Sequence, residues 1–185
     1  MLHAVRLLLA LLPATALAAP PPYELVSRRA ADAPGRTTGP GASRAPFFSG
    51  DGRWLYFTSE MAGPGLEAAG PGTTDALRRD LESGALELLS PRPPGAPFNP
   101  QGVTALAASM DDRWVLLESG AVLTPGDTNG APDVFLRDTA QGVTELISVN
   151  AAGTGPGNGA SDDALMTPDG RWVLFRSWAT DLVAT

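Results

Sequence analysis

The residues with the clearest chemical potential in this 185-residue sequence are four oxygen-bearing side chains in one short segment. Asp127, Asn129 and Asp133 surround an Asn–Gly turn, and Asp138 follows five residues later. Carboxylate and amide oxygens are hard ligands of the kind that calcium prefers. The segment departs from the EF-hand loop, because Ala131 stands at the fifth position and Asp138, not Glu, at the twelfth. These four side chains are the candidate ligands of a calcium ion, and the sequence predicts no other cofactor.

A structural role is the competing interpretation of the same segment. Asn and Asp side chains cap backbone amides in turns, and Gly130 accepts a positive φ without steric cost. In an earlier segment of the chain, Asp75 and Asp80 correspond to the last two candidate ligands, whereas Ala69 and Pro71 correspond to the first two. The repeated aspartates are therefore interpreted as architectural, and Asp127 with Asn129 as the pair specific to this segment.

The inventory of reactive side chains excludes most catalytic sites. The only histidine is His3, and the sequence contains no cysteine and no lysine. Without them a Ser–His–Asp triad, a Cys–His pair, a histidine-ligated zinc site, a lysine Schiff base and a phosphate-binding P-loop cannot form. A carboxylate pair for glycoside cleavage is the remaining option, and the spacing of the acids does not locate one. We predict that the chain is not an enzyme, with no catalytic residues.

Three tryptophans occur once each at equivalent positions, and an arginine precedes each of them: Arg53–Trp54, Arg113–Trp114 and Arg171–Trp172. A ligand-stacking set is one interpretation of these aromatics, but packing between sheets is favoured because large aromatics dominate such cores. For the arginines, ion pairs with nearby acids are favoured over a channel for an anion. Trp178 lies outside the pattern and is expected to be exposed.

The elements that position these side chains recur along the chain. Segments 52–59, 112–119 and 170–177 begin three units, with tryptophans 60 and 58 residues apart. The remaining landmarks of the repeat are the pair 75–80 and 133–138, and the closing segments 24–27, 87–90 and 145–148. Each landmark is predicted to be a strand. The tryptophan segments 54–57, 114–117 and 172–175 are short apolar runs rich in aromatic and branched residues, which suit strands covered on both faces. A further strand is expected before each later tryptophan, near 106–109 and 164–167, giving about four strands per unit.

The units resemble TolB-type, or WD-like, β-propeller repeats of bacterial envelope and secreted proteins. The segments 127–138 and 167–175 carry the resemblance, which extends over roughly 23–185. It implies an all-β fold of antiparallel four-stranded blades of a β-propeller, incomplete, with about two full blades plus partial ones. A propeller serves many functions, so the resemblance does not by itself assign one.

The N-terminus predicts export. Residues 1–18 have the basic flank, short apolar core and small-residue cleavage site of a signal peptide. The domains expected after it are a linker over 19–46 with the closing strand of a partial blade near 23–27, repeat 1 over 47–90, repeat 2 over 91–148 and a truncated repeat 3 over 149–185. We expect a periplasmic or secreted protein with no membrane insertion after signal cleavage.

The charge and the repeat number restrict the partners. A formal charge of −7 argues against binding to nucleic acid. The sequence ends inside the third unit, which predicts a fragment or a chain that self-associates through open sheet edges. Our prediction is a non-enzymatic interaction or binding platform for another envelope or secreted protein. Two alternatives stay open: the propeller domain of an exported hydrolase whose catalytic part lies beyond Thr185, and a calcium-stabilised structural repeat.

Overall fold

The computed structural model describes residues 42–60, 73–96 and 101–183. These residues form ten β-strands in three antiparallel sheets and no helix. No helix long and apolar enough to cross a membrane therefore occurs in this part of the chain. The signal peptide, the closing strand expected near 23–27 and most of the linker lie outside the described residues.

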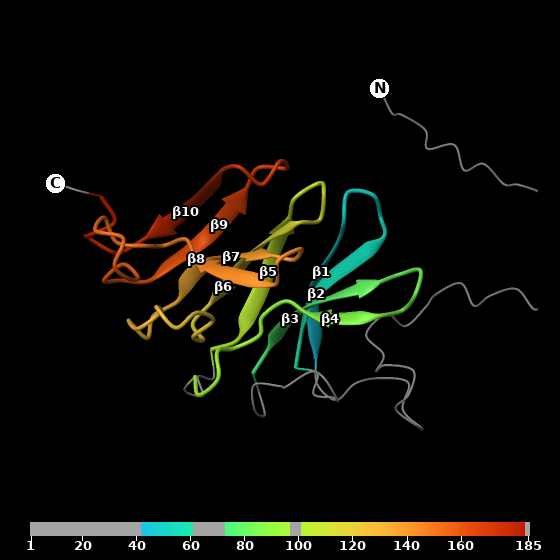
Figure 1. Ribbon diagram of the computed structural model, residues 1–185, viewed down its shortest axis with the longest axis horizontal. Helices are drawn as coiled ribbons and strands as arrows, with labels where there is room; N and C mark the ends of the chain where they lie inside the picture. The colour runs from blue at the N-terminus through green and yellow to red at the C-terminus, as the bar shows by residue number, and fades with distance from the viewer. Residues whose placement is uncertain (1–41, 61–72, 97–100, 184–185) are drawn as a thin grey trace, which may run out of the picture.

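The strands follow the repeat, and Figure 1 shows the three sheets succeeding one another across the molecule. Blade 1 contains β1 (Ser43–Phe48), β2 (Trp54–Ser59), β3 (Asp75–Asp80) and β4 (Leu86–Leu88) in that order. Blade 2 contains β5 (Val103–Ala108), β6 (Trp114–Ser119), β7 (Asp133–Asp138) and β8 (Val143–Leu146), and the third sheet pairs β9 (Ser161–Met166) with β10 (Val173–Ser177). The prediction of antiparallel four-stranded blades is confirmed.

The register of the strands repeats residue by residue. In blade 1, Trp54 pairs with Asp80 and Ser59 with Asp75. Trp114 pairs with Asp138 and Ser119 with Asp133 at the same places in blade 2. The first strand pair of each sheet also contains an irregularity of register, of the β-bulge kind.

One domain boundary differs from the sequence prediction. Residues 43–46 were expected to belong to the linker, but they form the first part of β1. Five of the six residues of β1 are exposed, all except Phe47, so the strand lacks the apolar alternation that marks a half-buried strand. The segment forms a strand because it pairs with β2, although its own sequence does not indicate a strand.

The turn before each tryptophan shows how the same bend forms with different residues. Gly52 and Gly170 adopt φ values of 74° and 70°, and Asp112 adopts 58° in the equivalent place of blade 2. Asp is among the few residues that tolerate this left-handed region. The second copy, with Asp112 in the place of a glycine, therefore forms the same turn.

The main core lies between blades 1 and 2. Tyr56 and Leu89 of blade 1 pack in one buried cluster with Val115, Leu117 and Phe135 of blade 2. Alternation along β6 directs Leu116 to the opposite side, because successive strand residues point to opposite faces of a sheet. Blade 2 is consequently covered on both faces.

A second core joins blade 2 to the third sheet. Leu116 and Val134 of blade 2 form a buried cluster with Ala164 of β9, and Val173 and Phe175 of β10 pack against it. The outward positions of the third sheet have no such cover among the described residues, and they leave 66% of Leu165 and 70% of Leu174 exposed.

The tryptophan predictions have two outcomes. Trp54 and Trp114 are partly buried against the cores of the blades, which confirms the packing interpretation for them. Trp172 is 71% exposed, so packing between blades does not hold for the third copy in this structure. Trp178 is 58% exposed, as expected from its place outside the repeat.

Candidate functional site

The predicted ligand segment lies in the loop that joins β6 to β7 in blade 2. Asp133 is the first residue of β7 and is fully buried. The Ser148 hydroxyl donates a 2.6 Å hydrogen bond to Asp133 Oδ1, and it also accepts one from the backbone N–H of Val134. Together these bonds fasten the start of β7 to the residues that follow β8.

Blade 1 contains the same arrangement. The Ser90 hydroxyl donates to Asp75 Oδ1 at 3.2 Å and accepts a bond from the backbone N–H of Ala76. The Asp–Ser hydrogen bond therefore recurs in both blades as a structural feature of the repeat. This agrees with the architectural interpretation of the repeated aspartates. Sequence reasoning grouped Ser90 and Ser148 with the closing landmarks but missed that they bond the strand-initial Asp.

Asp127 brings a second carboxylate to Asp133. Its side chain is also buried, with 5% of the residue exposed. Burial raises the pKa of Asp127 to about 6, and the charge of Asp133 adds to that rise. Burial likewise raises the pKa of Asp133, which the hydrogen bond from Ser148 partly offsets. Two neighbouring acids therefore share a site that resists a double negative charge.

Each of these two carboxylates has one buried oxygen without a hydrogen-bond partner. They are Oδ1 of Asp127 and Oδ2 of Asp133. The hydroxyl of Thr124, three residues before Asp127, is a further buried oxygen without a partner. Buried polar groups are rarely left unpaired, since desolvation without compensation is costly. These oxygens are available to a ligand.

Asn129 shapes the loop that carries Asp127. Its Oδ1 accepts a bond from the N–H of Ala131, and its Nδ2 donates a 2.9 Å bond to the carbonyl of Gly157. Gly130 follows with a φ of 67°. The Asn129 side chain therefore caps a backbone amide of the turn, as the structural interpretation predicts. It also connects the turn to the loop before β9 through the Gly157 carbonyl.

Asp138 lies away from the other three candidates. It ends β7, five residues after Asp133, so about 17 Å of extended strand separates them. Its Oδ2 accepts a 2.8 Å bond from Arg113, and its Oδ1 accepts bonds from the N–H groups of Ala140 and Gln141. The fold does not bring Asp138 to a site shared with Asp127, because the two lie at opposite ends of the blade.

The arginines before the first two tryptophans form ion pairs, as favoured from the sequence. Arg53 contacts Asp80 at 2.8 Å, just as Arg113 contacts Asp138. The guanidinium of Arg113 also lies 4.7 Å from the ring centre of Trp114. Each arginine thereby fastens the turn before β2 or β6 to the end of the next strand.

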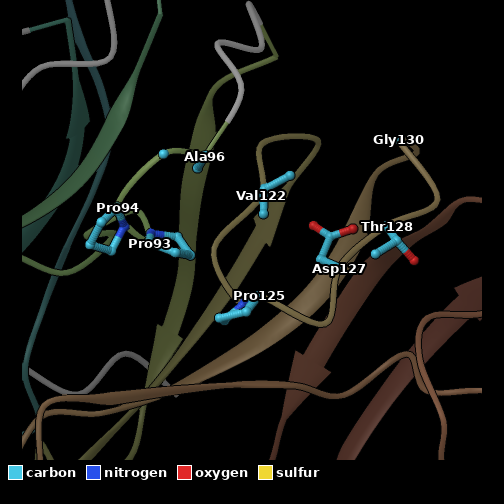
Figure 2. Close-up of a pocket in the computed structure, with 9 residues that line it drawn as sticks. Pro93, Pro94, Ala96, Val122, Pro125, Asp127, Thr128 and Gly130 are labelled. Carbon is cyan, nitrogen blue, oxygen red and sulfur yellow. The ribbon is translucent and has the colours of Figure 1, made fainter.

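An open pocket of about 460 Å³ adjoins Asp127 and was not foreseen from the sequence. Pro93, Pro94 and Ala96 line it from the segment after β4 of blade 1, and Val122, Pro125, Asp127, Thr128 and Gly130 from the β6–β7 loop of blade 2. Figure 2 shows the Asp127 carboxylate on the loop side, facing a wall that is otherwise largely prolines and small apolar groups. Proline fixes its own φ, so this wall is stiff.

The described residues contain no group of three or more His, Cys, Asp or Glu side chains placed to hold a metal. A cation at Asp127 and Asp133 would need neutral oxygens as its further ligands, from carbonyl groups, hydroxyl groups or water. Calcium accepts such mixed oxygen ligands in irregular geometry.

These features define an all-β protein built from antiparallel four-stranded blades. No family model matches the sequence, and no curated protein sequence matches it. Among solved structures, the chain is similar to TolB from Acinetobacter baumannii, with 17% identity, a TM-score of 0.45, and coverage of 74% of this chain and 26% of that one. It is also similar to Kuenenia stuttgartiensis hydrazine synthase, with 14% identity, a TM-score of 0.37, and coverage of 69% of this chain and 35% of that one. The chain thus spans about a quarter to a third of these two structures.

Proposed function

We propose that this chain is an exported, non-enzymatic binding module of the propeller type, which recognises another envelope or secreted protein. The observation that carries the proposal is the pocket between the Pro93–Pro94 segment and the β6–β7 loop. Loops of two neighbouring blades build it, and its lining is mainly apolar with one carboxylate at the side. Concave, largely apolar pockets with a few polar groups are the usual sites of ligand recognition.

The chemistry available supports binding over catalysis. The single histidine, His3, lies in the expected signal peptide, and neither cysteine nor lysine occurs in the sequence. Asp127 and Asp133 are the buried acids of the site, and after residue 18 the sequence holds no histidine, cysteine or lysine to act with them. Stiff proline walls suit an extended apolar segment of a partner, because a preformed surface loses little entropy on binding.

The export part of the proposal rests on residues 1–18 and predicts a periplasmic or secreted product. Expression of the whole sequence in a Gram-negative host, followed by cell fractionation, tests it. The protein is expected outside the cytoplasm with its mass reduced by residues 1–18. An uncleaved cytoplasmic product would contradict export without affecting the binding part.

The binding part is tested by photo-crosslinking in the native host. A photoreactive residue at Thr128, which is exposed and lines the pocket, is compared with one at Glu82, which is exposed on a turn of blade 1. We expect a discrete protein adduct from position 128 and none from position 82, and loss of that adduct when Val122→Arg places a charge in the apolar lining. Equal adducts from both positions, or none from position 128, would refute a pocket-centred interaction.

The non-enzymatic part has its own test. The purified protein is incubated with chromogenic esters, phosphate esters, glycosides and peptides. We expect no turnover above buffer. Turnover that follows the protein through purification and disappears in Asp127→Asn would show that the carboxylate pair is catalytic.

A further inference from the structure

Within residues 42–60, 73–96 and 101–183, no cationic side chain pairs with the two buried carboxylates of blade 2. Asp127 and Asp133 are 5% and 0% exposed, and each has a buried oxygen without a partner. The other oxygen of Asp133 is bonded by a neutral hydroxyl, that of Ser148. Burying charge is costly unless a charge of opposite sign or a metal compensates it.

Blade 1 provides an internal comparison, since its equivalent acid is compensated. Asp75 occupies the place of Asp133, and Arg92 Nη2 lies 4.0 Å from its Oδ1. Arg92 stands two residues after Ser90, and the residue two after Ser148 is the neutral Asn150. In the sequence, Ala69 corresponds to Asp127.

The two blades therefore differ in the charge of the residues at these corresponding positions. Among the described residues of blade 1, one acid, Asp75, stands beside one arginine, Arg92. Blade 2 replaces the alanine by Asp127 and the arginine by Asn150, so its two acids sum to −2. The side chain of Asn150 is engaged within its own loop, where it bonds the carbonyl of Pro156 and the N–H of Thr154. One divalent cation balances these two acids.

The donor atoms select the kind of cation. The sequence has no cysteine, and its one histidine is at position 3, so the ligands at this site are oxygens alone. Oxygen-only sites suit calcium, magnesium and manganese rather than zinc or copper. The ligands lie in an irregular loop, which favours calcium because magnesium demands near-ideal octahedral geometry. Asp127 also lines the open pocket, which gives an ion a route from solvent.

We infer that Asp127 Oδ1 and Asp133 Oδ2 bind one calcium ion, which fastens the β6–β7 loop to the start of β7. Neutral oxygens of the same loop and water complete its coordination. Asn129 holds the loop in shape through its bonds to Ala131 and Gly157, and Asp138 takes no part. The inference is independent of the pocket's partner.

The test is thermal unfolding and titration calorimetry of the purified full chain, with calcium chloride added after removal of metal by a chelator. At calcium a hundredfold above the dissociation constant, the midpoint of unfolding is expected to rise by about 5 to 10 °C. Calorimetry should give one ion per chain. Magnesium chloride at the same concentration should give a smaller rise.

The decisive variant transfers the charge pattern of blade 1 to blade 2. Asp127→Ala with Asn150→Arg gives blade 2 the residue types that the first copy has at the corresponding sequence positions, Ala69 and Arg92, so the double variant should fold without calcium and show no calcium-dependent rise. Glu82→Gln, on an exposed turn of blade 1, is the matched control and should keep the full rise.

Three outcomes would overturn the inference. The first is an unfolding midpoint of the unaltered chain that calcium at millimolar concentration does not move. The second is a calcium-dependent rise that survives in the double variant. The third is a rise with magnesium equal to that with calcium, which would remove the assignment to calcium.

Discussion

At the scale of single residues, identical aspartates have different roles according to their contacts. Asp80 and Asp138 end strands, pair with an arginine and cap the turn that follows. Asp133 begins a strand and receives a serine hydroxyl. Asp127, which corresponds to Ala69 in the first copy of the repeat, is buried, and the charge of Asp133 acts on it. Only the last two acids are buried without positive charge, and they are the ones that we assign to binding.

The lowered pKa of Asp80 predicts that the folded protein loses stability in acid. The hydrogen bond from Arg53, followed by N–H groups of the next turn, lowers the pKa of Asp80 to about 2, against an ordinary value of 3.8. A carboxyl whose pKa is lower in the folded state stabilises the fold above its unfolded pKa, and this contribution disappears as the pH falls from about 4 to 2.

Thermal unfolding between pH 7 and pH 2 measures this effect in Asp80→Asn. The variant should melt below the unaltered chain at pH 7, and the difference should shrink as the pH falls through the window from 4 to 2. Glu82→Gln on the same exposed turn is the control. A difference that is constant across this pH range would show that the ionisation of Asp80 does not stabilise the fold.

At the scale of elements, the two four-stranded blades repeat one scheme: a bulged first strand, a turn in the left-handed region, a buried second strand, and a third strand with Asp at both ends. The turn matters because it also contacts the neighbouring element. Asp112 Oδ1 accepts a 3.2 Å bond from the Tyr56 hydroxyl of blade 1, and its carbonyl accepts bonds from Arg78 and Thr139. A local bend thereby connects two blades.

Asp112→Ala is predicted to destabilise the protein by about 1 to 2 kcal/mol, because alanine disfavours a φ of 58° and cannot accept the Tyr56 bond. Asp112→Asn should have an effect below about 0.5 kcal/mol, since Asn tolerates this conformation and keeps an acceptor oxygen. Urea unfolding of both variants makes the measurement. Equal losses in the two variants would mean that the carboxylate charge matters more than backbone conformation.

At the scale of the whole molecule, sheets stack face to face and each inner face is buried by the next blade. Leu116 in β6 is fully buried beneath the third sheet. Leu174 stands at the equivalent place in β10 and is 70% exposed. The same residue type at the same repeat position thus differs in burial according to which blade it occupies.

The different burial of Leu116 and Leu174 predicts that their replacement by alanine lowers the free energy of unfolding by different amounts. Leu116→Ala should reduce the free energy of unfolding by about 2 to 5 kcal/mol, the usual range for removal of a buried leucine side chain. Leu174→Ala should change it by less than about 0.5 kcal/mol, as for surface positions. Chemical unfolding of the two variants under identical conditions compares them. A large loss in Leu174→Ala would show that this face is covered in solution.

The sequence by itself determined the repeat and the strands at its landmarks. These follow from local spacing, since a strand alternates its faces regardless of what covers it and a turn selects Gly, Asn or Asp by φ alone. The sequence did not indicate that β1 begins at Ser43, because the exposed residues of β1 lack that alternation.

Only the tertiary structure decided which of the four candidate ligands lie at one site and which lie apart. Five residues of extended strand place Asp133 and Asp138 at opposite ends of a blade, although the sequence sets them close together. The contact of Arg92 with Asp75, the burial of Asp127 and the pocket beside it all depend on residues that loops and neighbouring strands bring together. The physical reason is that burial and charge compensation are properties of the surroundings, which come from distant parts of the chain.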